Sequence, residues 1–209
     1  MASCSALRER LSVAGLVVAS ALLPQSALAH GAVPGIMGFY SGFLHPLISF
    51  DQLLALLALS VMCGLAPKPW FGRSWLVFAT VAIVGICFGL LGYQDARVSP
   101  ALMAIGFVAA GLAALRPSGV QTIQILLSAL AGALVGVSSA PDPGPVRDMI
   151  ITACGGLVGA NYILLAVVGG ICWFRDRFDH EWSLIAVRII AAWIATISIS
   201  MAALALTPR

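Results

Sequence analysis

The stretch GFLHPLISFDQLLALLALSVMCG, residues 42–64, decides how the rest of the chain is interpreted. It places a histidine, a proline and an aspartate at the start of an apolar run that is long enough to cross a bilayer as a helix. Asp51 is the only charged side chain between residues 46 and 66. A carboxylate inside a spanning segment costs about 2.5 to 3.5 kcal/mol on insertion scales, which makes Asp51 a candidate functional residue.

Pro46 predicts where this helix begins, because proline suits the first helical position, where a backbone N–H has no partner. His45 is then the cap. On a regular helix His45, Ser49 and Gln52 share one narrow stripe. Asp51 lies about 120° away from His45 on such a helix, so a shared site needs a non-helical cap or a ligand from another segment. The alternative is that His45 only caps the helix and Asp51 hydrogen-bonds to a neighbouring helix.

Composition sets the class of protein. Of the 209 residues, 61% are hydrophobic and 9% are charged, whereas a soluble domain carries about 25% charged residues. We therefore expect an all-α, polytopic membrane protein whose partner is the lipid bilayer. The net charge of +3 is spread through the loops and gives no support for a nucleic-acid partner. No HExxH, P-loop or GxSxG pattern and no CxxC pair occurs, so we expect neither an enzyme nor a tightly bound cofactor.

Residues 1–29 have the three parts of a secretory signal peptide: Arg8 and Arg10 in a basic leader, an apolar core, and Ala-Leu-Ala at 27–29 as the cleavage site. Cleavage would make His30 the new N-terminus. The amine and imidazole of an N-terminal histidine can chelate one metal ion such as Ni²⁺ or Cu²⁺. The alternative is that His30 only follows the cleavage site in a flexible arm.

The mature arm, residues 30–41, is rich in glycine and is expected to be a loop on the membrane surface. Beyond the first helix, five more apolar segments predict six transmembrane helices after cleavage, in a domain of residues 30–209. These five segments span residues 75–93, 100–115, 121–138, 149–174 and 184–206.

The loop charges predict the orientation. With the mature N-terminus outside, the inner side holds Lys68, Arg73, Arg116, Arg175, Arg177 and Arg188, and the outer side holds Arg97, Arg147 and Arg209. This excess of inner positive charge places the protein in a bacterial inner membrane with a periplasmic N-terminus.

Other polar and small residues have simpler explanations. The GxxxG spacings Gly85–Gly89, Gly132–Gly136 and Gly155–Gly159 predict tight helix packing rather than a dimer signal. Asn161 lies in the middle of the fifth span, where it either faces Asp51 or makes an interhelical hydrogen bond. Gln121, Thr122 and Gln124 are explained by capping and interface hydration at the start of the fourth span.

The segment HPLISFDQLLA, residues 45–55, resembles the signature of the HupE/UreJ family of hydrogenase and urease accessory membrane proteins, His-Pro-x-x-Gly-x-Asp-His-Leu-Leu-Ala. Ser49 stands where the family has glycine, and Gln52 where it has histidine. The resemblance implies six spans and transport or delivery of a divalent metal ion, nickel, for metalloenzyme maturation. Combined with the residues described above, it gives a model in which His30, His45 and Asp51 form a metal site, with Ser49, Gln52 and Asn161 as candidate pathway residues.

Two rival functions remain open. Many members of the family have a second histidine-rich stretch near the fourth span, but residues 128–145 contain no histidine. Copper(I), which prefers sulfur, could instead use Met37, Met62, Cys63 and Cys87. The chain could also be a non-transporting structural or assembly subunit, associated with other membrane subunits or with itself.

Overall fold

The computed structural model describes residues 38–93, 95, 97–115 and 119–207, except for the side chains of Lys68 and Leu206. The chain divides into residues 1–31 and 32–209, and every described residue belongs to the second part. The predicted signal peptide, its cleavage site and His30 lie outside the described residues.

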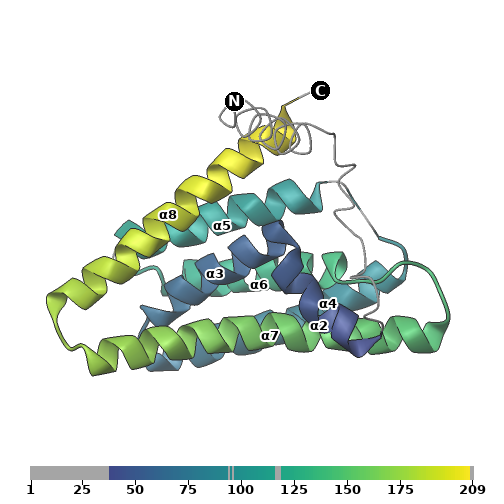
Figure 1. Ribbon diagram of the computed structural model, residues 1–209, viewed down its shortest axis with the longest axis horizontal. Helices are drawn as coiled ribbons and strands as arrows, with labels where there is room; N and C mark the ends of the chain where they lie inside the picture. Colours follow the sequence, from purple (N-terminus) through teal and green to yellow (C-terminus); the bar gives the residue numbers. More distant parts are fainter. Residues whose placement is uncertain (1–37, 94, 96, 116–118, 208–209) are drawn as a thin grey trace, which may run out of the picture. The chain divides into compact units, whose positions relative to one another are not determined.

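The described residues form helices and no strand. The helices are α2 (Phe39–Ile48), α3 (Phe50–Gly64), α4 (Lys68–Leu90), α5 (Val98–Leu115), α6 (Gln121–Ser138), α7 (Val146–Arg177) and α8 (Glu181–Leu206) (Figure 1). By length and composition, five helices could each cross a membrane, and α2 with α3 would make a sixth span that is bent by 74°. The predicted all-α membrane fold is confirmed, and the segment expected as its first span is broken into two helices.

Helices α4 and α7 begin earlier than predicted, because their first turns contain polar residues. α6 has the predicted bounds, 121–138, whereas α4 begins at Lys68 instead of residue 75 and α7 begins at Val146 instead of residue 149. Both early starts follow a proline at the N-cap, Pro67 and Pro145. Proline fixes a backbone angle that suits a helix start, and hydropathy alone does not register it.

The predicted start of the first span is wrong. His45 and Pro46 lie inside α2 rather than at a helix cap, and residues 39–41, expected as part of a loop, are its first turn. The chain leaves the helix only at Ser49, whose φ of −74° and ψ of 103° are extended. Pro46 has no N–H to donate to the preceding turn, which weakens the helix shortly before this break.

The three GxxxG spacings pack helices within this chain, as predicted. A Cβ at Gly132 of α6 would lie 2.5 Å from the carbonyl oxygen of Phe78 on α4, and a Cβ at Gly136 would collide with another carbonyl of α4. Gly155 and Gly159 bring α7 equally close to the backbone of α2. Small residues permit such backbone contact in lipid, where no hydrophobic force draws helices together.

α3 lies at the centre of this arrangement. It contacts every other described helix, and eleven of its fifteen residues are buried. At its C-terminal end, Arg175 of α7 donates a hydrogen bond to the carbonyl of Gly64, at 3.4 Å. Arg188 of α8 likewise donates to the carbonyl of Ala114 near the end of α5, at 2.6 Å. Basic side chains stabilise the negative ends of helix dipoles in this way.

Candidate metal site at the broken helix

The break between α2 and α3 brings polar backbone into an otherwise apolar segment (Figure 1). His45 lies in the last turn of α2 and Asp51 in the first turn of α3. Ser49 joins the two helices, since its N–H donates to the carbonyl of His45 and its own carbonyl accepts from Leu53, both at 2.9 Å. In membrane proteins, helix ends that meet within a span are typical sites for substrates and ions.

His45 links this break to α6. Its Nε2 atom lies 3.2 Å from the carbonyl oxygen of Ser138 and 3.3 Å from Oγ of Ser49. A carbonyl oxygen can only accept, so the contact with Ser138 requires the tautomer that carries a proton on Nε2. The lone pair of a neutral ring is then on Nδ1. Ser138 is the last residue of α6, and the carbonyl end of a helix carries partial negative charge that favours a cation.

Gln52 reaches the neighbouring residue of α6. Its side chain is 1% exposed, and its Oε1 accepts a long hydrogen bond of 3.4 Å from Oγ of Ser139. We call His45, Ser49, Gln52, Ser138 and Ser139 the His45 cluster. The cluster joins α2, α3 and α6 and gathers the imidazole of His45, the hydroxyls of Ser49 and Ser139, the side-chain amide of Gln52 and the backbone carbonyl of Ser138.

Asp51 adjoins the cluster without a described contact to His45. Its side chain is half-buried, and Oδ1 accepts a hydrogen bond from the backbone N–H of Gln52 at 2.9 Å. The positive end of the α3 dipole stabilises a carboxylate in this first turn. The carboxylate is therefore held by its own helix, and the predicted hydrogen bond to a neighbouring helix is not among its described contacts.

Asn161 belongs to a different contact. Its Oδ1 accepts from Nε1 of Trp75 at 3.0 Å, and its Nδ2 donates to the carbonyl of Leu157 at 2.8 Å. These bonds tie α7 to α4 and correspond to the interhelical hydrogen bond that the sequence left open. The described contacts do not bring Asn161 to Asp51.

Several buried or half-buried polar residues do not follow from the sequence interpretation. It does not include Ser138 and Ser139, although two serines directly after an apolar run and shortly before Pro141 are a recognisable signal. The prediction that Gln124 is hydrated at the interface is wrong, because its side chain is 1% exposed. Nε2 of Gln124 donates to Oγ of Ser74 at 2.9 Å and lies 3.5 Å from Sγ of Cys63. Distant helices supply these partners, which local sequence cannot show.

The described residues hold few strong metal ligands in one place. No group of three or more His, Cys, Asp or Glu side chains that could hold a metal ion occurs among them. His30 and Met37 lie outside the described residues. Cys63 is buried whereas Cys87 is exposed on α4, so the candidate sulfur ligands for copper are dispersed among the residues that can be placed.

Comparison with known proteins gives one family. A family model described as HupE / UreJ protein matches residues 17–201, which is most of the chain. No curated protein and no solved structure matches it.

Proposed function

Because the chain belongs to the HupE/UreJ family, we propose that it transports or delivers a divalent metal ion for metalloenzyme maturation, with nickel as the metal. The family is one of membrane accessory proteins rather than enzymes. The helices of this chain are long and apolar enough for such a role. The observation that carries the proposal is the His45 cluster at the break between α2 and α3.

The donor atoms of the cluster suit a partly dehydrated divalent ion. Imidazole nitrogen binds nickel, copper and zinc well, and hydroxyl, amide and carbonyl oxygens complete the coordination of such ions. In this proposal Nε2 of His45 supplies the nitrogen, and the ring takes the other tautomer, with its proton on Nδ1, when the ion binds. Ser49, Gln52 and the carbonyl of Ser138 supply oxygens from three separate elements. A pathway needs ligands that hold the ion without trapping it, and these uncharged groups satisfy that condition.

Asp51 supplies negative charge beside the cluster. A divalent ion that enters a low-dielectric region needs some compensation of its charge. Oδ1 of Asp51 is engaged by the N–H of Gln52, which leaves Oδ2 as the atom that faces an incoming ion in this proposal. In the same scheme His30 captures the ion first, and the ion then passes to His45 and Asp51.

Two places where the family has histidine and this chain does not meet in the cluster. Gln52 occupies the position where the signature has histidine, and Ser139 lies in the stretch where many members have their second histidine-rich segment. The structure joins these two residues by a hydrogen bond of 3.4 Å. The site therefore offers more oxygen and less nitrogen than the signature implies, which supports a weaker and less selective nickel site.

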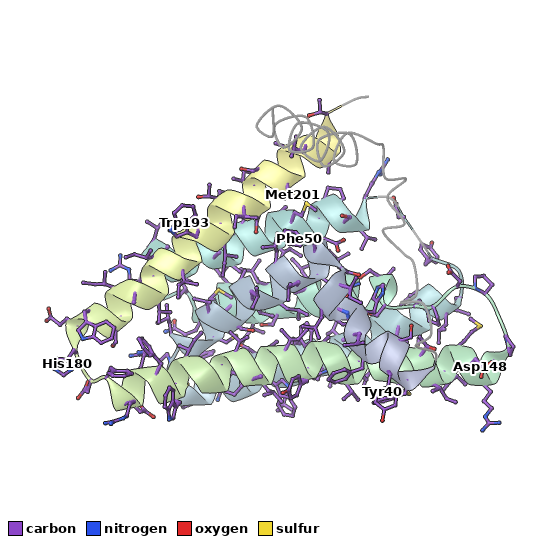
Figure 2. All side chains as sticks on the ribbon, viewed as in Figure 1. Tyr40, Phe50, Asp148, His180, Trp193 and Met201 are labelled. Atoms are coloured by element: carbon purple, nitrogen blue, oxygen red, sulfur yellow. The ribbon has the colours of Figure 1, made fainter. Side chains whose placement is uncertain are left out.

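Uptake of radioactive nickel by cells that express the full-length chain tests this function. We expect His45→Ala and Asp51→Asn to lower the uptake rate by at least about tenfold, the effect of losing a ligand interaction of about 1.4 kcal/mol. His180→Ala and Asp179→Asn are matched controls, because both residues are exposed in the turn between α7 and α8. Figure 2 shows His180 in this turn. Wild-type uptake in the His45 and Asp51 variants, at equal protein levels, would rule out the proposed site.

Two further measurements address the rival functions. If the protein handles copper, a deletion strain should become sensitive to copper while nickel uptake is unchanged. If it is an assembly subunit, a partner should copurify with it in mild detergent in a fixed ratio, and His45→Ala should leave that ratio unchanged.

A further inference from the structure

Three buried polar side chains converge well away from the His45 cluster. Gln124 of α6, Ser74 of α4 and Cys63 of α3 are each 1% exposed. Nε2 of Gln124 donates to Oγ of Ser74 at 2.9 Å and to Sγ of Cys63 at 3.5 Å. We call these three residues the Gln124 cluster. Both described hydrogen bonds of the Gln124 amide use its nitrogen.

Such a group is costly in the core of a membrane protein. Its polar side chains have to serve as one another's partners, because hydrocarbon offers none. Apolar residues or glycine occupy most of the other buried positions of α3 and α6, among them Leu59 and Ala131. Polar residues that persist inside a helix bundle are typical of substrate and ion pathways.

The two clusters lie on the same helices. α3 carries Gln52 and Cys63, which are eleven residues apart and so separated by about 16 Å along the helix axis. α6 has Gln124 near its start, and Ser139 directly follows its last residue. Each helix therefore presents polar side chains at both ends of one buried face.

Apolar side chains separate the clusters. Leu56 and Leu59 of α3, Phe78 of α4 and Val135 of α6 are all at most 1% exposed. All four belong to the hydrophobic core that surrounds α3. An ion cannot rest among these side chains, so any passage between the clusters has to be a brief step that follows local opening.

We propose that the Gln124 cluster is a second cation site on the transport route, beyond the apolar segment. This inference rests on the proposed function. Rotation of the Gln124 amide would turn Oε1 toward Ser74 and Cys63 in place of Nε2. Oε1, Oγ of Ser74 and Sγ of Cys63 would then coordinate a borderline divalent cation such as Ni²⁺. Cys63 would bind as the thiolate, so its thiol proton passes to water as the cation binds. The sulfur makes this second site softer than the oxygen-rich His45 cluster, which gives the ion a reason to move inward.

The rate at which the Cys63 thiol is alkylated measures whether a cation occupies the Gln124 cluster. In the full-length chain, replacing Cys4, Cys87, Cys154 and Cys172 by alanine leaves Cys63 as the only thiol. Membrane vesicles are treated with N-ethylmaleimide, with and without nickel chloride, and alkylation is followed by mass spectrometry. We expect slow alkylation of Cys63, and a rate about tenfold lower at a nickel concentration of ten times the dissociation constant, by mass action.

Matched variants complete the test. A chain whose only thiol is Cys172, which is half-buried on α7, should show no effect of nickel. Gln124→Leu should abolish the protection of Cys63, whereas Gln121→Leu, at the half-buried start of α6, should retain it. Thermal unfolding of each purified variant shows that the comparison is between folded proteins.

The outcomes separate this inference from the proposed function. Cys63→Ala and Gln124→Leu should each lower nickel uptake several-fold, while Cys87→Ala, on the exposed face of α4, should leave it unchanged. If His45→Ala stops uptake but the Cys63 and Gln124 variants transport normally, the second site is refuted and the proposed function stands. Alkylation of Cys63 that ignores nickel, or a Cys63 that is never alkylated, also overturns the second site.

Discussion

The contact of α6 with α4 at Gly132 and Gly136, which we call the seam, and the His45 cluster both involve α6. The two regions are built in opposite ways. At the seam, Gly132 and Gly136 have no side chain, and the backbones of the two helices touch. At the end of the same helix, Ser138 and Ser139 meet His45 and Gln52 through polar atoms alone. The seam fixes α6 against α4, and that position delivers the two serines to the break between α2 and α3. Substitutions in the seam should therefore lower the stability of the protein, whereas substitutions in the His45 cluster should change metal uptake.

The largest effect is expected at the seam. In Gly132→Ala, the added Cβ would lie 2.5 Å from the carbonyl oxygen of Phe78, so α4 and α6 must separate. We expect a loss of about 1 to 3 kcal/mol in the free energy of unfolding, as is usual for overpacked interiors. Thermal unfolding in detergent measures it.

Gly169→Ala is the matched control for the seam. Gly169 lies on the exposed side of α7, and a Cβ added there would have no neighbouring atom within 4 Å, so stability should be unchanged or slightly increased. Alanine favours a helix over glycine by up to about 1 kcal/mol. Equal melting temperatures for Gly132→Ala and Gly169→Ala would show that the helices are not in backbone contact.

A smaller effect is expected from restoring a family ligand to the cluster. Gln52→His would place a second imidazole beside Ser139 and near His45. We expect the nickel concentration for half-maximal uptake to fall by about tenfold, equivalent to about 1.4 kcal/mol. The melting temperature should change little, because the seam is untouched.

Gln121→His, the same substitution at the start of α6, is the control and should leave uptake unchanged. If Gln52→His raised the half-maximal concentration or had no effect, the oxygen-rich cluster would not be the place where metal selectivity is set.

The comparison also explains what the sequence could and could not predict. The GxxxG spacings predicted close packing correctly, because glycine at a four-residue interval acts through the backbone and needs no knowledge of the partner. The apolar runs predicted the spans because the length and hydrophobicity of a segment are also local properties of the sequence. The break at Ser49 was missed because Pro46 is equally compatible with the first turn of a helix and with a position shortly before a helix ends.

The site depends on long-range contacts that a single sequence cannot supply. His45 and Ser138 are 93 residues apart, and Gln52 and Ser139 are 87 apart. Gln124 has the sequence context of an interfacial residue, and only its partners on α3 and α4 reveal a buried one. The residue types are visible in the sequence, but their grouping depends on how the close glycine contacts position the helices.

The smallest effect is expected at the contact between Trp75 and Asn161. This contact tests whether Asn161 belongs to the pathway of the ion. If this hydrogen bond only holds α4 to α7, Trp75→Phe should lower the free energy of unfolding by about 0.6 to 1 kcal/mol. Nickel uptake per folded molecule should then be unchanged. Trp193→Phe is the control, since Trp193 points away from the bundle on α8 (Figure 2) and is 66% exposed. Reduced uptake at unchanged stability in Trp75→Phe would instead return Asn161 to the route of the ion.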